Sequence, residues 1–375
     1  MTLDPCVFNL DKGDYERTPL FLGEPAGLLD SLNKKYPQLW SLYKKLKALD
    51  WDENEFNYTS CIADFKTCSK STYDLMIKSL AWQWESDSVA ARMVGPVGAQ
   101  FTSCTELQCL WQQITGNEMV HALTYSEIVK NSFEDPDVIF KEILSIKEAH
   151  ARLATVSKVF ESAYLVSHKL ALSRHGAAHG ITVEKQDTEQ DIYNVIFMYV
   201  AALYMLERVQ FIASFAVTFA ICETGLFMPI GEAVKKICQE EYEIHAVADR
   251  RILEIEMSTP RGKRAVAECK DSIEKMLNEV IESEKTWLWY AFSEGRELPG
   301  VTKELLFSYT LFSAKEIYEF FDLTCPYEIP QKNPLRFMDS WLDISDIQGS
   351  PQEARSGAYM LGSLKDTSTG KSYEI

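Results

Sequence analysis

One nine-residue segment constrains the fold of this chain more than any other: Asn117-Glu-Met-Val-His-Ala-Leu-Thr-Tyr125. Three residues of helix turn a side chain to within about 60° of its starting direction, and seven residues to within about 20°. The carboxylate of Glu118, the imidazole of His121 and the phenol of Tyr125 therefore share one stripe of one helix. A carboxylate and a histidine at i, i+3 suit a helical bundle that holds a metal in its interior.

Further acids and a second histidine extend this pattern along the chain. A second acid–histidine pair lies at Glu241 and His245, and single carboxylates lie at Asp87 and Glu207. The residues around Glu207 are apolar, and a carboxylate is costly to bury there unless it is paired or binds a metal. The order of these groups on four predicted helices matches the ligand inventory of a dinuclear carboxylate site. Four carboxylates and two imidazoles favour iron or manganese over a structural zinc.

Some of these assignments have local alternatives. Glu85 is chemically as suitable a ligand as Asp87, and Glu240 or Glu243 could replace Glu241. The stretch that holds these last three acids also fits a solvated, charged helix face. Its acid–histidine spacing is i, i+4, which keeps both groups on one face about 40° apart. A one-residue bulge in the helix would restore the geometry of an i, i+3 pair.

The 375 residues predict an all-α chain without internal repeats. Helices of 25 to 35 residues are long for a globular protein and favour a bundle. A short helix is expected after Asp135, and residues 176–187 form a loop that could hold a small hairpin. We expect one domain over residues 1–345 and an irregular tail over residues 346–375, which are small and polar. The main predicted helices cover 30–48, 71–92, 102–132, 147–174, 188–223, 231–257, 264–293 and 302–319.

Composition excludes several classes of function. The net charge of 38 − 55 = −17 argues against a nucleic-acid surface and against adhesion to anionic membranes. Nine cysteines without any C-x-x-C pair indicate reduced thiols in a cytoplasmic protein. The most apolar stretch, residues 195–227, carries several polar and charged side chains, and a membrane-spanning helix rarely does.

Several local stretches together resemble the small, radical-generating subunit of class I ribonucleotide reductase, over roughly residues 15 to 375. The segment from Glu118 to Tyr125 matches a ligand pair followed by a radical tyrosine. The other matching stretches are Asp50-Trp51-Asp-Glu, Trp82-Gln-Trp-Glu-Ser-Asp87-Ser, Leu206-Glu207-Arg-Val-Gln-Phe211-Ile-Ala-Ser-Phe215, Ile237-Cys-Gln-Glu240-Glu241, and Ile347-Gln-Gly-Ser-Pro-Gln-Glu353 followed by Tyr359.

The resemblance implies a ferritin-like bundle with a dinuclear metal site in its core. Two irons, or manganese or a mixed pair, react with dioxygen and oxidise Tyr125 to a stable radical, in a pocket lined by Phe211 and Phe215. Trp51 and Glu240 lie beside the first histidine ligand, although the family usually has Asp where Glu240 stands. The implied ligands are Asp87, Glu118, His121, Glu207, Glu241 and His245.

The resemblance also implies partners. The chain forms a homodimer and acts as a ribonucleoside-diphosphate reductase only with its large catalytic subunit. The tail, residues 346–375, docks on that subunit, and Tyr359 relays the oxidising equivalent. Two other interpretations stay open: a different di-iron carboxylate oxidase, of desaturase or hydroxylase type, and a metal-free structural bundle.

Overall fold

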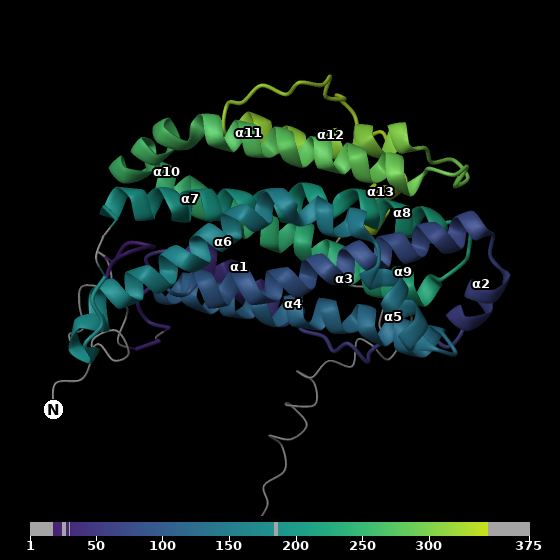
Figure 1. The fold of residues 1–375 in the computed structure, drawn as a ribbon, viewed down its shortest axis with the longest axis horizontal. Coiled ribbons are helices and arrows are strands. Elements are labelled where there is room, and N and C mark those ends of the chain that lie inside the picture. The colour runs from purple at the N-terminus through teal and green to yellow at the C-terminus, as the bar shows by residue number, and fades with distance from the viewer. Residues whose placement is uncertain (1–17, 25–27, 30, 184–186, 344–375) are drawn as a thin grey trace, which may run out of the picture.

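Long helices lie side by side along one common direction in the computed structural model (Figure 1). The structure describes residues 18–24, 28–29, 31–183 and 187–343. The α-helices are α1 (Pro37–Ala48), α2 (Cys61–Thr67), α3 (Lys70–Gly98), α4 (Thr105–Ser132), α5 (Pro136–Leu144), α6 (Lys147–His175), α7 (Glu189–Met205), α8 (Ile212–Cys222), α9 (Met228–Glu240), α10 (Ala246–Met257), α11 (Pro260–Ala291), α12 (Lys303–Phe320) and α13 (Phe337–Leu342).

The all-α prediction is confirmed, since the described residues form only two isolated β-bridges and no strand. The hairpin suggested for residues 176–187 is wrong over the part of that loop that the structure describes. Residues Gly176–His179 form a 3-10 turn there, and Gly180 follows in the left-handed conformation with φ of 73°. The first predicted helix begins later than expected, at Pro37, where a proline suits the first turn. The predicted tail, residues 346–375, lies outside the described residues.

Helices α3 and α4 approach each other closely because glycines face the contact. A Cβ on Gly98 would stand 2.4 Å from the ring of Trp111, and a Cβ on Gly95 would stand 2.3 Å from Thr115 Oγ1. The amide of Gly95 donates a hydrogen bond to that same hydroxyl at 2.8 Å. Only residues without a side chain allow this approach, which fixes the position of α3 relative to α4.

Two of the long helices contain a π-helical turn. Residues Leu206–Gln210, labelled η2, separate α7 from α8, and residues Glu241–His245, labelled η3, separate α9 from α10. A π-turn adds one residue to a helical turn and is frequent at functional sites. Each of these turns contains residues that the sequence predicts as metal ligands.

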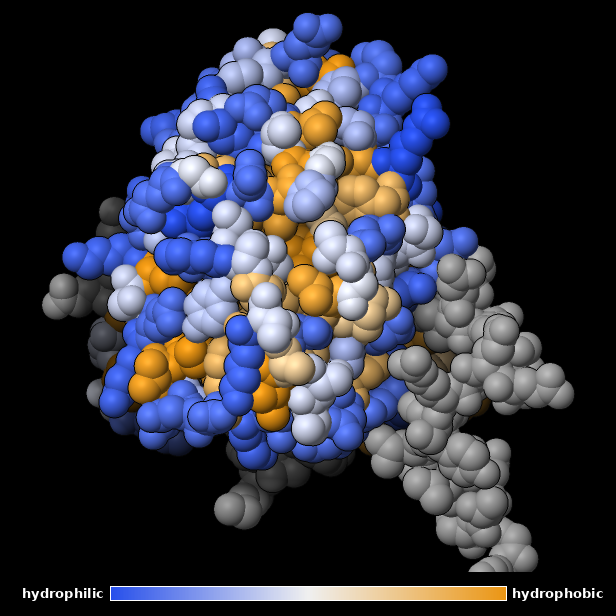
Figure 2. All heavy atoms as spheres, turned by 90° about the vertical axis from the view of Figure 1, so that its right-hand side faces the viewer, coloured by the Kyte–Doolittle hydropathy of each residue, from blue (hydrophilic) through white to orange (hydrophobic). Residues whose placement is uncertain are grey.

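The apolar stretch that runs through α7, η2 and α8 lies in the core of the bundle. Residues Glu189–Cys222 are long and apolar enough to cross a membrane, but 83% of their most apolar window is buried within the protein. Burial of this extent is typical of a core helix in a helical bundle of a soluble fold. At one end of the molecule, apolar side chains lie interspersed with many hydrophilic ones (Figure 2).

Candidate metal centre

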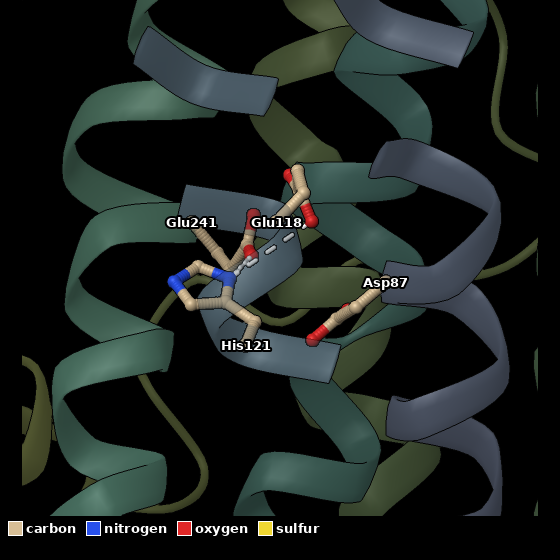
Figure 3. Close-up of side chains that lie close together, drawn as sticks. All are labelled: Asp87, Glu118, His121 and Glu241. Atoms are coloured by element: carbon tan, nitrogen blue, oxygen red, sulfur yellow. Dashed lines mark ion pairs between the residues drawn. The ribbon is translucent and has the colours of Figure 1, made fainter. Parts of the chain in front are cut away.

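Six acid and imidazole side chains from four elements meet in the middle of the bundle. Asp87 comes from α3, Glu118 and His121 from α4, and the others from the two π-turns. The carboxylate of Asp87 reaches from its helix toward the group formed by His121, Glu118 and Glu241 (Figure 3). All six are at most 2% exposed. They are the predicted ligands Asp87, Glu118, His121, Glu207, Glu241 and His245.

The six residues form two overlapping groups, each with the spacing of a metal site. In each group one ligand atom per residue lies within 4.8 Å of the others. Glu118 and Glu241 belong to both groups. The first group adds Asp87 and His121, and the second adds Glu207 and His245. This geometry suits two neighbouring cations that share two carboxylates.

The imidazoles face the shared carboxylates. His121 Nδ1 lies 2.7 Å from Glu241 Oε1 and 3.9 Å from Glu118 Oε2. His245 Nδ1 lies 2.9 Å from Glu241 Oε2 and 3.1 Å from Glu118 Oε1. The two rings are nearly parallel, with centroids 5.9 Å apart. Both histidines therefore present the same nitrogen, Nδ1, to one small volume.

Burial and mutual repulsion raise the pKa of three carboxyl groups. For Asp87, burial is the largest cause and the charges of Glu118 and Glu241 add to it. Burial and the charge of Glu241 likewise raise the pKa of Glu207 and of Glu118. Without a cation, the site holds protons on these groups instead of negative charge.

The pKa shifts of Glu241 and His245 instead favour the charged form of each group. Burial opposes ionisation of Glu241, but His245, Glu207 and His121 outweigh it and hold the pKa of its carboxyl well below the usual range. Burial likewise opposes the charged form of His245, yet Glu241 and Glu118 raise the pKa of its imidazole to about 10. Positive charge is thus already attracted to the place that the two groups share.

The fit of a metal to this donor set can be tested on unpartnered atoms. Neither oxygen of Asp87 has a hydrogen-bond partner, although the side chain is fully buried. Glu118 is also fully buried, and neither of its oxygens accepts a well-aligned hydrogen bond, although Oε1 lies 3.1 Å from His245 Nδ1. Oε2 of Glu207 lacks one as well. Buried polar atoms are normally satisfied, so a cluster of orphaned donors and acceptors indicates a missing ligand. Oxygen and imidazole ligands without any thiolate fit iron or manganese.

Tyr125 is completely buried one turn beyond His121 on α4. Its hydroxyl has no hydrogen-bond partner. Burial, and next the charge of Asp87, raise the pKa of its phenol well above the usual value. The phenol therefore stays protonated and shielded from solvent beside a carboxylate of the first group.

Glu240 connects the centre to Trp51. The Nε1–H of Trp51 donates to Glu240 Oε2 at 3.0 Å, and His121 Nε2 lies 2.8 Å from the same oxygen. The indole and imidazole rings are 6.1 Å apart. The extra methylene of Glu, compared with the family's Asp, therefore leaves both contacts in place.

The alternative ligands lie elsewhere. Glu85 Oε1 is 3.1 Å from His150 Nε2, and neither residue belongs to the two groups. Glu243 is partly exposed and is also absent from them, while Glu240 contacts His121 on the ring nitrogen opposite Nδ1. The predicted lining residues Phe211 and Phe215 are buried and stacked, with ring centroids 5.5 Å apart.

The comparisons with known proteins agree with this geometry. The family model of the ribonucleotide reductase small chain matches residues 30–334. The chain belongs to this family. The beta subunit of ribonucleoside-diphosphate reductase from Buchnera aphidicola (Schizaphis graminum) is 23% identical over 98% of each chain. The beta subunit of ribonucleoside-diphosphate reductase 1 from Escherichia coli O157:H7 is 22% identical, covering 96% of this chain and 95% of that protein.

Solved structures confirm the ferritin-like fold expected for the family. The ribonucleotide reductase R2 subunit from Clostridium botulinum superposes with a TM-score of 0.73 and 18% identity, covering 90% of this chain and 97% of that one. The dimanganese(II)-NrdF of Streptococcus sanguinis gives a TM-score of 0.64 and 12% identity, covering 84% and 99%. Family membership makes the chain the small subunit of an oxidoreductase, ribonucleoside-diphosphate reductase, and implies a large-subunit partner.

Sequence reasoning missed one charged pair close to the centre. Arg152 on α6 and Glu284 on α11 form a buried ion pair that contacts the end of η2. A faint signal exists, since Arg152 lies on the same helix face as the buried Ala149 and Val156. Charged residues are usually exposed, so this position alone did not reveal the pair.

Proposed function

We propose that this small subunit generates a tyrosyl radical on Tyr125 with the help of two metal ions. Asp87, His121 and the shared carboxylates would hold one ion, and the second group of ligands would hold the other. When bound, iron in such a site supplies the reaction with dioxygen that oxidises a nearby phenol. The observation that carries this proposal is a fully buried phenol with an unpartnered hydroxyl, beside two overlapping groups of orphaned ligands.

The side chains around the site would exclude solvent and accept the phenolic proton. Burial of Tyr125 excludes water and reductants, which a phenoxyl radical must avoid. Oxidation of a tyrosine releases its phenolic proton, and Asp87, whose charge acts most strongly on this phenol, is its proposed acceptor. Phe211 and Phe215 contribute apolar bulk to the same core.

The hydrogen-bonded series His121, Glu240 and Trp51 supports a route by which the oxidising equivalent leaves the centre. One carboxylate oxygen bridges both ring systems. Trp51 is only 6% exposed and lies close to the surface cation of Lys236, whose Nζ is 5.4 Å from the ring. We place the next relay, Tyr359, in the tail that docks on the large subunit.

A homodimer fits the surface of α4. Met119 and Leu123 are 51% and 50% exposed on the helix that carries two predicted ligands. Exposed apolar side chains one turn apart are a feature of protein interfaces. The eight described cysteines are unpaired, which supports a reducing, cytoplasmic environment.

Electron paramagnetic resonance tests the proposal. Ferrous loading followed by exposure to oxygen should give a tyrosyl signal in the wild type and none in Tyr125→Phe, which should still bind metal. Tyr199→Phe is a matched control, because Tyr199 is equally buried but donates its hydroxyl to the Met93 carbonyl at 2.7 Å. An unchanged signal in Tyr125→Phe, or none in the wild type, would refute the assignment.

The tail is tested separately. Truncation after residue 345 should keep the Tyr125 signal but abolish binding to the large subunit, whereas Tyr359→Phe should keep binding and stop turnover. Full nucleotide reduction by the truncated protein would contradict both roles. The alternative of a substrate-oxidising enzyme gains no support from an open groove of about 930 Å³ along α6 and α11, because its lining includes none of the six predicted ligands.

A further inference from the structure

The most unusual charged pair outside the metal centre lies between α6 and α11. Arg152 is 1% exposed and Glu284 is completely buried. The guanidinium donates through Nε to Glu284 Oε1 at 2.6 Å and through Nη2 to Oε2 at 2.5 Å. It also lies over the rings of Trp82 and Trp287, at 4.0 and 5.0 Å from their centroids.

Such a pair is not explained by stability alone. Removing two charges from water costs about as much as their attraction returns, and apolar residues of similar size often serve as well. The presence of a buried arginine is better explained by its planar guanidinium, whose five N–H donors can hold several acceptor groups in fixed positions. The contacts that remain after pairing with Glu284 show what Arg152 orients.

The other hydrogen bonds that the guanidinium donates both reach the junction between η2 and α8. Arg152 Nη2 donates to the carbonyl oxygen of Gln210 at 2.6 Å, and Nη1 donates to Ser214 Oγ at 2.8 Å. Trp82 Nε1 donates to the same Gln210 carbonyl at 3.1 Å. In return, Gln210 Nε2 donates to the main-chain oxygen of Arg152 at 3.0 Å.

This junction is where a π-turn disturbs the regular helix. The α-helical donor to the Gln210 carbonyl would be the amide of Ser214, but that amide donates to the Phe211 carbonyl at 3.1 Å. Two side-chain donors satisfy the Gln210 carbonyl from outside the helix. Gln210 is the last residue of η2, and the predicted ligand Glu207 is the second.

We propose that Arg152 is a positioning residue for the metal ligand Glu207, acting through the Gln210 carbonyl. Glu284 fixes the guanidinium, the guanidinium and the Trp82 indole hold the end of the π-turn, and the π-turn directs Glu207 to the second ligand group. This inference rests on the proposed metal centre. It singles out one site, because Glu207 belongs to the second group only.

The experiment removes the contact of Arg152 with the Gln210 carbonyl without leaving an unpaired buried charge. The double variant Arg152→Met with Glu284→Met replaces both partners by apolar side chains. Trp82→Phe independently removes the other donor to Gln210. Arg296→Met is the control, since Arg296 is also buried and donates to the main-chain oxygens of Ala291 and Tyr290, at the end of α11.

Binding of Mn²⁺ is measured by counting free ions with electron paramagnetic resonance, alongside thermal unfolding. The wild type should bind two ions. The double variant should bind one ion as before and the other about tenfold more weakly, and Trp82→Phe should act on that same ion. In a Glu207→Ala background, adding the double variant should cost little more, because the support has no ligand left to position. Arg296→Met should lower the melting temperature and leave both affinities unchanged.

Three results would overturn the inference. Wild-type affinity for both ions in the double variant would show that Glu207 needs no such support. Equal weakening of both ions, matched by Arg296→Met at the same loss of thermal stability, would reduce Arg152 to a general structural role. A wild type that binds no Mn²⁺ would refute the metal centre itself, and the inference with it.

Discussion

The two halves of the candidate metal centre are built differently. Asp87, Glu118 and His121 stand on α3 and α4, which run through the site as uninterrupted α-helices. Glu207, Glu241 and His245 stand on π-turns that interrupt the other two ligand-bearing helices. A regular helix fixes its side chains by its own hydrogen bonds, whereas a π-turn frees main-chain groups that need partners from outside. The second half should therefore depend more on its surroundings.

The sharpest way to break this comparison is to change the helical register. Inserting an alanine between Asn117 and Glu118 turns the rest of α4, including the shared Glu118 and His121, by about 100°. We expect both metal ions to be lost, measured as metal per chain. Deleting Glu243, a partly exposed residue of η3, should instead convert the π-turn into an ordinary turn with i, i+3 spacing and keep both ions. Equal loss in both variants would contradict the distinction.

Single ligand substitutions should separate shared from unshared groups. Glu241→Ala removes a carboxylate of both groups and should reduce occupancy from two ions to none. His121→Ala and His245→Ala each alter only one group and should each leave one ion. Metal analysis after loading with excess Mn²⁺ and desalting measures this. Occupancy of two ions in Glu241→Ala would refute the sharing of that carboxylate.

The regular half should be sensitive to helix packing instead. A methyl group on Gly98 would meet the Trp111 ring at 2.4 Å, so Gly98→Ala should force α3 away from α4. We expect a loss of about 1–3 kcal/mol in the free energy of unfolding, measured by denaturant titration. Gly116→Ala on α4 is the control, because that position is open, and it should be neutral or slightly stabilising. A neutral Gly98→Ala would show that the two helices can adjust.

The smallest expected effect is a pH dependence that both halves share. Burial raises the pKa of Asp87 and of Glu207, so the metal-free fold loses stability as pH rises above about 4, where these groups ionise in the unfolded chain. His245, with its pKa raised to about 10, stabilises the metal-free fold most below about pH 6.5 and loses this effect as pH rises toward 10. Both terms weaken the metal-free protein with rising pH.

Metal ions displace these protons, so the stabilisation that they provide should grow with pH. Melting temperatures with and without Mn²⁺ at pH 5.5, 7 and 8 measure it. The low pKa of Glu241 has no influence in this window, because that carboxyl is ionised throughout in both states. A difference in melting temperature that stays constant from pH 5.5 to 8 would contradict the coupling.

The contrast between regular helices and π-turns also explains which parts of the candidate site could be predicted from the sequence. The helical class, the long ligand-bearing helices and the i, i+3 pair on α4 follow from local spacing, since the geometry of an α-helix repeats regularly. The i, i+4 spacing of Glu241 and His245 left Glu240 and Glu243 open as ligands. The structure distinguishes their positions: η3 brings Glu241 and His245 into the candidate centre and leaves Glu243 partly exposed, while Glu240 contacts Nε2 of His121.

The sequence by itself determined which chemical groups this protein has and which helix faces they share. Tertiary structure decided which groups meet: the two overlapping sets of ligands, the single oxygen of Glu240 between His121 and Trp51, and the contact of Arg152 with η2. Arg152 and Gln210 are 58 residues apart, and Glu240 and His121 are 119 apart. Local hydrogen bonding sets the spacing along one helix, but contacts over such separations depend on how whole helices pack, which no local pattern specifies.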